Sequence, residues 1–247
     1  MRRAKPSFQH PLGALHLSLP PGPRNVKQRL RTASGRSNAS QQWLTRQLSD
    51  PYVKAARDGG WRSRAAFKLI ELDERHHLLR PGLRVIDLGA APGGWTQVAA
   101  RAVGERGRVV ALDLLPMDPV GGAIILEGDF QDAATERAVR EALGGQADLV
   151  LSDMAPNTTG HGNTDHLRII ALAELALHFA EAVLAPGGAF VAKVFQGGAE
   201  RQMQARLKRL FARVTHAKPP ASRKGSSELY VVAAGFRGEV DAGGPAA

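Results

Sequence analysis

The apolar residues of this 247-residue chain form short continuous runs that alternate with longer amphipathic stretches. Runs such as VVAL, LVL and LYVVAA lack the apolar–polar alternation of a half-exposed sheet. They therefore predict strands that are buried on both faces. Six such strands are expected at 83–88, 108–113, 123–127, 148–152, 188–195 and 228–236, and a further strand at 213–217 makes seven.

The stretches between these strands predict helices at 94–103, 132–143, 165–184 and 199–211, the third ending at the Pro/Gly sequence APGG, 185–188. Three more helices are expected before the first strand, at 40–48, 50–57 and 62–79. Ser40 is a suitable cap for the first of these, and Asp50 followed by Pro51 is a favourable start for the second. Such alternation predicts an α/β fold, a doubly wound Rossmann-like parallel sheet with helices on both faces.

The ends of the chain differ in composition from its middle. Residues 1–35 are rich in Pro, Gly, Ser and Arg without sustained periodicity, which predicts a disordered basic arm. A single domain is expected at 36–237, followed by a loose tail at 238–247. An Arg-rich, acid-free start also resembles a mitochondrial transit peptide, but prolines at 11, 20, 21 and 23 interrupt any amphipathic helix. We therefore favour a cytoplasmic protein, with the mitochondrial matrix as the alternative.

The net charge of +10 is concentrated at the N-terminus. Residues 1–49 contain nine Lys or Arg and no Asp or Glu, whereas the remainder contains 24 basic and 23 acidic side chains. Two basic clusters follow, and either one alone is typical of a solvated helix face. Together with the arm they favour binding to RNA phosphates. The clusters are Lys54, Arg57, Arg62, Arg64 and Lys68 around Trp61, and Arg206, Lys208, Arg209, Arg213, Lys218, Arg223 and Lys224.

The chain contains no cysteine and no apolar run long enough to span a bilayer, so no membrane association is expected. Disulfides and the cysteine-dependent methylation of pyrimidine C5 are thereby excluded. His161, Asp165 and His166 lack the spacing of a strong metal-ligand pattern, so no metal is expected.

The sequence VIDLGAAPGGW at 85–95 predicts a buried strand, a tight glycine turn and the start of a helix. Such a turn places a small ligand at the carboxyl edge of the sheet. A dinucleotide site requires glycine at the first, third and sixth positions, but here these are Gly89, Ala91 and Gly94, and Pro92 lacks an N–H. Asp113, 24 residues after Gly89, could bind ribose hydroxyls. The turn therefore suits a nucleoside without phosphates, such as S-adenosylmethionine, or else no ligand at all.

Four motifs occur together: VIDLGAAPGGW, ALDLLPMDP at 111–119, LSDMAPN at 151–157 and VAKVFQG at 191–197. In this order and spacing they resemble the FtsJ/RrmJ family of ribosomal RNA ribose 2′-O-methyltransferases, from near Gly35 to about Arg237. The resemblance implies a seven-stranded S-adenosylmethionine-dependent methyltransferase fold with one late antiparallel strand. It also implies, as substrate, a uridine in the A-loop of large-subunit (23S) ribosomal RNA on the assembled 50S particle. We expect a monomer.

Four charged residues lie in unusual positions, and the residues themselves leave each open. Asp153 follows an apolar strand at the edge that carries sites in open α/β sheets, with a turn cap as the alternative. Lys193 lies inside FVAKVF, where burying its charge costs free energy unless the side chain is paired or neutral. The alternative is that it reaches solvent. Lys68 has Glu71 three residues later as a neutralising partner, and Glu228 has the alternative of an exposed strand end.

The resemblance assigns these residues to a catalytic tetrad of Lys68, Asp153, Lys193 and Glu228. It implies that Gly93 and Trp95 lie near the methionine end of the cofactor and that Asp113 binds the ribose. It further implies that Asp129 binds the adenine amine, with Phe130 beside the ring, and that Asp153 contacts both cofactor and reacting centre. Asp129 has an alternative role as a cap for the helix at 132–143.

Other functions remain open at this stage. Adenine amino-methyltransferases carry an aromatic residue after the fourth strand, whereas this chain has Asp153-Met154-Ala155-Pro156-Asn157. A methyltransferase for a small molecule or a protein would fit the glycine turn but would not need the basic arm or the tetrad. A ribosome-assembly factor that binds RNA without catalysis would not need an intact tetrad.

Overall fold

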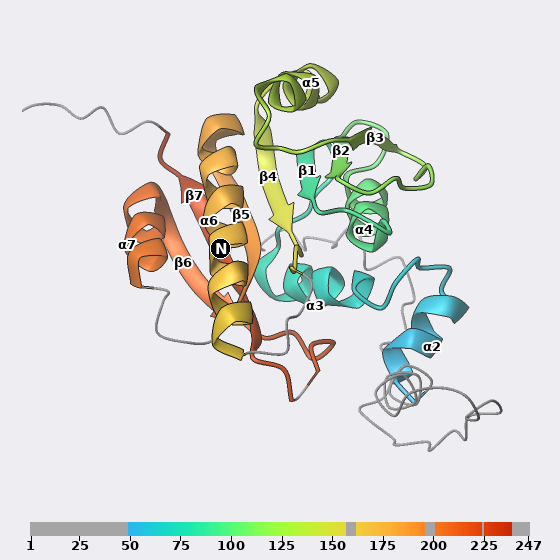
Figure 1. The fold of residues 1–247 in the computed structure, drawn as a ribbon. Helices are drawn as coiled ribbons and strands as arrows, with labels where there is room; N and C mark the ends of the chain where they lie inside the picture. Colours follow the sequence, from blue (N-terminus) through green and yellow to red (C-terminus); the bar gives the residue numbers. More distant parts are fainter. Residues whose placement is uncertain (1–48, 157–161, 196–200, 224, 239–247) are drawn as a thin grey trace, which may run out of the picture.

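The computed structural model describes residues 49–156, 162–195, 201–223 and 225–238 of the chain. Seven strands form one sheet in the order β3-β2-β1-β4-β5-β7-β6 (Figure 1). They are β1 (Arg84–Leu88), β2 (Arg108–Asp113), β3 (Ala123–Glu127), β4 (Ala147–Ser152), β5 (Leu184–Phe195), β6 (Phe211–Ala217) and β7 (Glu228–Phe236). Within the described residues, β7 is antiparallel to both of its neighbours and the other pairings are parallel. The expected α/β fold with one late antiparallel strand is confirmed.

The helices cover both faces of the sheet (Figure 1). They are α2 (Pro51–Asp58), α3 (Ala66–His76), α4 (Gly94–Val103), α5 (Ala133–Leu143), α6 (Gly162–Val183) and α7 (Arg201–Leu210). One apolar cluster joins α2, α3 and α4 to the sheet, and the other joins α5, α6 and α7 to the opposite face. The predicted start of α2 is confirmed, because Asp50 Oδ1 accepts the N–H of Tyr52 at 3.0 Å and Pro51 is the first helical residue.

Alternate side chains of each strand reach opposite faces, which decides where the charged residues point. On β5, Val191 belongs to the cluster beneath α3 and α4, whereas Phe190 and Ala192 belong to the cluster beneath α6. Lys193 is two residues after Val191 and therefore faces α3. Tyr230 is its partner across the β5–β7 pairing and lies in the same cluster.

Several predicted boundaries differ from the structure, and both ends of α3 do so for local reasons. The helix expected at 62–79 begins at Ala66 and ends at His76. At its start, the N–H of Arg62 donates to the side chain of Gln97 on α4 at 2.8 Å, which draws the chain towards the glycine turn. At its end, His77 is left-handed with φ 53°, and Asp73 accepts the N–H of Leu79 at 2.7 Å.

The APGG sequence does stop α6, which ends at Val183, but β5 begins earlier than expected. Ala147 pairs with Leu184 while Leu149 pairs with Ala189, so the Pro/Gly residues form a bulge within the strand. The helix expected at 40–48, the arm at 1–35 and most of the tail lie outside the described residues.

Candidate active site

The sheet register brings the four charged residues together at one edge. Asp153 follows β4 directly, and the neighbouring β5 carries Lys193 one residue after the Ser152–Ala192 pair. β7 runs in the opposite direction and begins at this edge with Glu228, which pairs with Phe195. Lys68 comes from α3, which covers this face. All four side chains are largely buried, with between 8% and 16% of each exposed.

Lys193 is held by Asp153 at two points. Its Nζ lies 2.7 Å from Asp153 Oδ1 and donates to the carbonyl oxygen of Asp153 at 2.8 Å. Glu228 Oε2 lies farther away, at 3.9 Å. The alternative that Lys193 reaches solvent at a sheet edge is therefore wrong.

Lys68 completes the cluster from the other side. Its Nζ lies 3.0 Å from both carboxylate oxygens of Glu228 and 3.5 Å from Asp153 Oδ2, and it donates to the Tyr230 hydroxyl at 2.9 Å. Glu71 instead accepts hydrogen bonds from the Tyr52 hydroxyl and the Ala221 N–H, so the alternative that Glu71 neutralises Lys68 is wrong. The alternative of Glu228 as an exposed strand end is also wrong.

Tyr230 is a fifth member of this cluster. Its hydroxyl donates to Asp153 Oδ1 at 2.6 Å, and its side chain is fully buried. Burial and the nearby charges of Asp153 and Glu228 raise the pKa of Tyr230 well above its ordinary value, so it remains a donor. Burial would by itself raise the pKa of Asp153, but Lys193, Lys68 and the hydrogen bonds of Lys193 and Tyr230 lower it below its usual value. Asp153 is therefore a carboxylate at neutral pH.

The glycine turn after β1 lies beside this cluster. Gly89 and Gly93 have φ values of 69° and 102°, which favour glycine. A Cβ on Gly89 would also collide with Met154, whereas one on Gly93 would approach Arg62 and Met117 to 3.0 Å. The turn is thus closed over by neighbouring side chains.

The N–H groups at residues 89 to 91 and 93 of the turn already have partners. Those of Gly89 and Ala90 donate to Leu112, and that of Gly93 donates to Ala90. The Ala91 N–H donates to Asp113 Oδ2 at 2.8 Å, and Pro92 has none. A cradle of free N–H groups, which a pyrophosphate requires, is therefore not what this turn provides.

Asp87, within β1, lies below the turn with 1% of its surface exposed. Its Oδ2 accepts a hydrogen bond from Thr96 Oγ1 at 2.7 Å. Burial raises its pKa to about 7, the Thr96 hydroxyl opposes this, and the charges of Asp153 and Asp113 add to it. Together with Asp153, Gly94 and Trp95, it lines a cavity of about 50 Å³. Such a cavity admits a small group and cannot enclose a nucleoside, which would have to lie along the open edge beside it.

The remaining expected cofactor residues follow this edge. Asp113, at the end of β2, accepts the N–H of Leu115 at 2.9 Å in addition to that of Ala91. Asp129 follows β3 and accepts the N–H of Gln131 at 2.9 Å. The residue at the cap position of α5 is Asp132, so the alternative of Asp129 as its cap is wrong. Phe130 packs edge-on against Phe179, with ring centroids 5.9 Å apart.

Trp95 contributes its ring to the wall between the turn and the cluster. It is 3% exposed, donates its indole N–H to the carbonyl oxygen of Ala65 at 2.8 Å, and lies 5.6 Å from the Tyr230 ring. The edge of the sheet beside the glycine turn and the charged cluster are therefore neighbours that share Asp153 and this aromatic wall.

Comparison with known proteins decides the family. A family model described as FtsJ-like methyltransferase matches residues 61–236, which is most of the chain. This chain belongs to the FtsJ-like methyltransferase family. The resemblance carried by the four sequence motifs is thereby confirmed.

Individual relatives of this FtsJ-like methyltransferase agree. The protein named ribosomal RNA large subunit methyltransferase E from Granulibacter bethesdensis is 65% identical over 220 residues, covering 88% of this chain and 94% of the relative. The protein of the same name from Paramagnetospirillum magneticum is 62% identical over 223 residues, with coverage of 88% and 91%. A Plasmodium falciparum structure described as a ribosomal RNA methyltransferase matches with a TM-score of 0.66 and 30% identity, covering 72% of this chain and 100% of that one.

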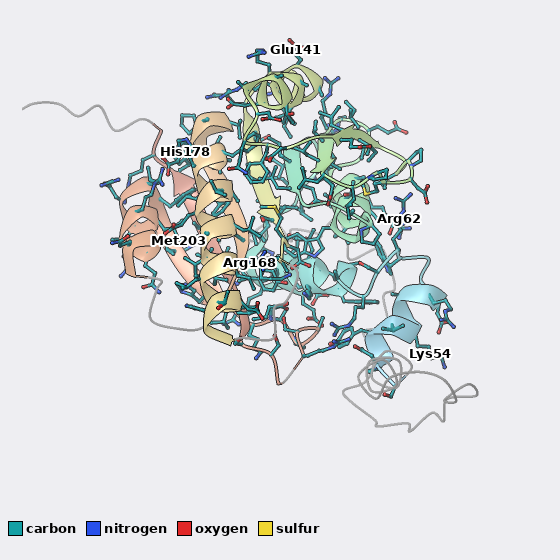
Figure 2. The ribbon with its side chains drawn as sticks, viewed as in Figure 1. Lys54, Arg62, Glu141, Arg168, His178 and Met203 are labelled. Carbon is teal, nitrogen blue, oxygen red and sulfur yellow. The ribbon has the colours of Figure 1, made fainter. Side chains whose placement is uncertain are left out.

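Most side chains of the first basic cluster of this FtsJ-like methyltransferase form contacts within the protein. Arg64 pairs with Asp50 at 2.8 Å, Lys68 belongs to the charged cluster, and Arg62 donates to backbone carbonyls of the turn and of residues 118 and 119. Lys54 and Arg57 on α2 stay exposed, and Figure 2 shows Lys54 at the outer end of the molecule. The expectation that the whole cluster faces RNA phosphates is therefore too broad.

The second basic cluster is mostly exposed. Lys208, Arg209, Arg213, Lys218 and Arg223 lie at the surface, whereas Arg206 pairs with Glu181 at 2.7 Å and Lys224 lies outside the described residues. Arg223 and Arg64 line a cleft of about 530 Å³ that reaches Glu228. Basic side chains therefore border the charged cluster on its open side.

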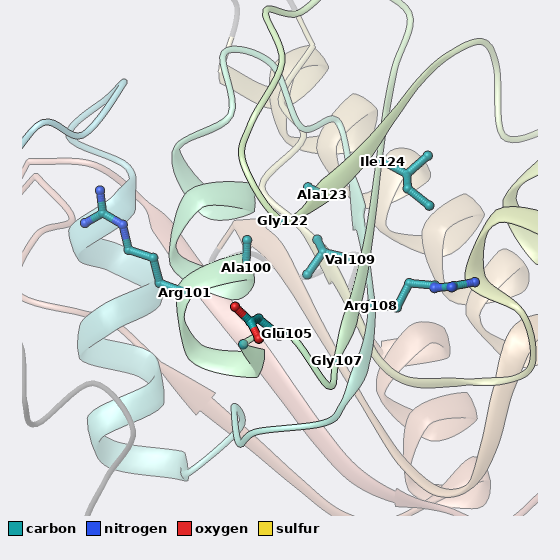
Figure 3. A pocket seen from close by; sticks show the side chains of 10 residues that line it. Ala100, Arg101, Glu105, Gly107, Arg108, Val109, Gly122, Ala123 and Ile124 are labelled. Carbon is teal, nitrogen blue, oxygen red and sulfur yellow. The ribbon is translucent and has the colours of Figure 1, made fainter.

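A further cavity of about 480 Å³ lies at the opposite edge of the sheet (Figure 3). Its lining includes Arg108 and Val109 at the start of β2, Ile124 near the start of β3, and Gly104 after α4. Sites in open α/β sheets form at the carboxyl ends of the strands, so this cavity is on the wrong edge for the chemistry.

Two features are absent from the described residues. These residues contain no group of three His, Asp or Glu side chains arranged to hold a metal ion. His161, one of the three residues considered for a metal, lies outside them. Among the described helices, none combines the length and apolar character that a membrane crossing requires.

Tyr230 and Asp87 are site residues that the sequence analysis missed. Both carried a readable signal. Tyr230 is two residues after Glu228 in a strand and so shares its face. Asp87 is a charged residue within an apolar strand, the same feature that singled out Lys193.

Proposed function

We propose that this protein transfers a methyl group from S-adenosylmethionine to a ribose 2′-hydroxyl of large-subunit ribosomal RNA. The observation that carries the proposal is the buried cluster of Lys68, Asp153, Lys193 and Glu228 next to the glycine turn. The relatives named ribosomal RNA large subunit methyltransferase E supply the substrate class. Within that class we propose a uridine of the A-loop on the assembled 50S particle.

The charge of the sheet edge beside the glycine turn supports S-adenosylmethionine as the donor. Asp87, Asp113 and Asp153 lie close enough for their charges to affect one another. Three carboxylates repel phosphates and attract the sulfonium and ammonium groups of S-adenosylmethionine. The N–H groups at residues 89 to 91 and 93 of the turn are already engaged, which disfavours NAD. The residues present therefore fit S-adenosylmethionine, and we propose that Gly93, Trp95, Asp113, Asp129, Phe130 and Asp153 hold it.

The bound donor would supply an activated methyl group, and the chain has to orient the ribose hydroxyl and accept its proton. Lys193 suits that role because two of the three hydrogen-bonding positions on Nζ are taken by Asp153. The third is left for the hydroxyl. We propose that Lys193 works as the neutral amine, keeping its two N–H groups on Asp153 while its lone pair takes the proton of the 2′-hydroxyl as that oxygen bonds to the methyl carbon. The electron pair of the broken C–S bond would stay on the sulfur of the donor. Orientation alone can contribute roughly 7–11 kcal/mol and general-base assistance about 10²–10⁴-fold.

The other cluster residues would hold Lys193 and the ribose in place. Asp153 fixes Lys193 through both its carboxylate and its carbonyl oxygen. Glu228, which Lys68 contacts, lines the cleft with Arg64 and Arg223, and we propose that a ribose and its phosphates enter there. We propose that the exposed basic residues and the arm at 1–35 bind the RNA backbone.

The remaining assignments follow from this role. We propose that the chain acts as a monomer of one catalytic domain at 36–237 between a basic arm and a tail at 238–247. It would work where the ribosomes are assembled, in the cytoplasm, with the mitochondrial matrix as the alternative if the arm is a transit peptide.

The proposal is tested by offering methyl-labelled S-adenosylmethionine with three acceptors in parallel: undermethylated 50S particles, 30S particles and ribosome-free protein extract. Label should enter the RNA of the 50S particles only. Label in protein or in small molecules would instead favour the general methyltransferase, and binding to 50S without transfer would favour a non-catalytic assembly factor.

A further inference from the structure

The connection between β6 and β7 is fastened to α3 at Ala221. The Ala221 N–H donates to Glu71 Oε2 at 2.6 Å, and its carbonyl oxygen accepts a hydrogen bond from Arg64. Ala221 is fully buried. Both backbone groups of this residue are therefore held by side chains from α3 and the turn before it.

The next residue reaches the active site. Ser222 Oγ donates to Glu228 Oε1 at 2.7 Å, while Glu228 Oε2 accepts from Lys68 Nζ at 3.0 Å. The hydroxyl of Ser222 thus supports Oε1 of the carboxylate, while Lys68 lies 3.0 Å from both of its oxygens. Any shift of Ala221 moves Ser222 with it and changes how Glu228 faces Lys68.

Glutamate is an unusual residue for a position whose only role would be to hold the backbone of Ala221. Only 9% of the surface of Glu71 is exposed, and its two hydrogen-bond partners are neutral, the Ala221 N–H and the Tyr52 hydroxyl at 2.8 Å. Burial raises the pKa of Glu71, although these hydrogen bonds and Arg64 oppose the shift. A buried carboxylate contributes little net stability compared with a well-packed apolar residue. A positional role explains its presence better than stability does.

We propose that Glu71 is a positioning residue for Glu228, an inference that rests on the proposed function of the site. Glu71 sits three residues after Lys68 on α3. One helix therefore supplies both the ammonium that pairs with Glu228 and the carboxylate that fixes the backbone behind it. Because α3 is a rigid element, it sets the distance between Lys68 and Glu228.

The first test compares Glu71→Leu with Glu71→Gln. Glutamine can accept from the Ala221 N–H and donate to the Tyr52 hydroxyl, which both donates and accepts. Glu71→Gln should therefore keep kcat near the wild-type value. Glu71→Leu removes the acceptor and should lower kcat by roughly 10- to 100-fold, as small misplacements of catalytic groups do, with the Kd for S-adenosylmethionine unchanged. Glu74→Leu, an exposed position on the same helix, is the matched control.

The second test separates positioning from loss of structure. If Glu71 acts through Glu228, Glu71→Leu should have little further effect on kcat in a Glu228→Ala background. Should Glu228→Ala leave too little turnover to measure, Ser222→Ala serves as the background with the same expectation. An equal loss from Glu71→Leu in both the wild-type and the variant background overturns the proposal, as does a Glu71→Gln variant that is as impaired as Glu71→Leu.

The wild-type arm of this experiment tests the proposed function independently. If the wild-type protein transfers no methyl group to 50S particles, the proposed function fails. If it does so and the coupling between Glu71 and Glu228 is absent, only the positioning role fails.

Discussion

Lys193 and Asp153 are joined twice, because Lys193 Nζ contacts both a carboxylate oxygen of Asp153 at 2.7 Å and its carbonyl oxygen at 2.8 Å. The carbonyl belongs to the backbone that leaves β4, so the position of Lys193 Nζ is fixed relative to the sheet. A side chain held in this way has a fixed direction towards whatever enters the cluster. It is the strongest candidate for the residue that meets the ribose hydroxyl.

Replacing Lys193 should remove nearly all turnover while cofactor binding survives. Lys193→Ala should lower kcat by about 10²–10⁴-fold, the usual contribution of a general base. Lys193→Arg should fail as well, because arginine stays protonated and has a different shape. Glu228→Ala should be milder, since Lys68 and Asp153 still position the substrate. Single-turnover rates and calorimetric Kd values measure the two effects, with the exposed Arg137→Ala as control. Near-normal turnover of Lys193→Arg across neutral pH would show that Lys193 acts only as an electrostatic clamp.

Asp113 should determine cofactor affinity. Asp113→Ala should weaken binding of S-adenosylmethionine by roughly 10- to 100-fold, because hydrogen bonds to charged groups contribute about 1.5–3 kcal/mol. Asp118→Ala is the matched control, since Asp118 is an exposed carboxylate in the segment that follows. Circular dichroism should show that both variants stay folded. Titration calorimetry that detected tight binding of NAD to the wild-type protein would contradict the assignment.

Asp87 should give stability an unusual pH dependence in the cofactor-free protein. Its pKa is raised to about 7 in the folded state, against an ordinary value of 3.8. Between these values the folded protein keeps a proton that the unfolded chain has lost, so this group lowers the free energy of unfolding as the pH rises through that window. Asp87→Asn should therefore be more stable than wild type at pH 8, with little difference at pH 4.

The same substitution separates stability from binding. S-adenosylmethionine carries positive charge, so its affinity for the wild-type protein should increase as Asp87 ionises near pH 7, and Asp87→Asn should remove that increase. Chemical denaturation and calorimetry at several pH values provide both curves. A wild-type affinity that stays flat from pH 6 to pH 8 would argue against Asp87 facing the cofactor.

The N-terminal arm should contribute to RNA affinity and to its dependence on salt. Phosphate contacts release counterions, so the logarithm of the association constant falls with the logarithm of salt concentration, with a slope of about 0.7 per phosphate on single strands. Deleting residues 1–35 should weaken binding and flatten this slope, with little change in cofactor affinity. Filter-binding titrations at several salt concentrations measure it, and an identical slope would place the arm outside the interface.

The sequence predicted most of the fold because the strands are continuous apolar runs, as at 108–113 and 228–236, which the structure reproduces at both ends. It could not predict where α3 begins, because that start depends on Arg62 reaching Gln97, 35 residues away. Motif resemblance named the four cluster residues. Their mutual contacts depend on the β5–β7 register and on the packing of α3, neither of which local pattern encodes. The Glu71–Ala221 contact spans 150 residues and carried no sequence signal.

Methyl transfer to a ribose 2′-hydroxyl is tested most directly by the chemical identity of the product. Undermethylated 50S particles are incubated with methyl-labelled S-adenosylmethionine and either the wild-type protein or Lys193→Ala, and the RNA is then hydrolysed in alkali. A 2′-O-methyl group blocks alkaline cleavage at its nucleotide, so the account predicts label in an alkali-resistant dinucleotide that yields 2′-O-methyluridine, with none from Lys193→Ala. Label in an alkali-labile mononucleotide, which marks a methylated base, would contradict it.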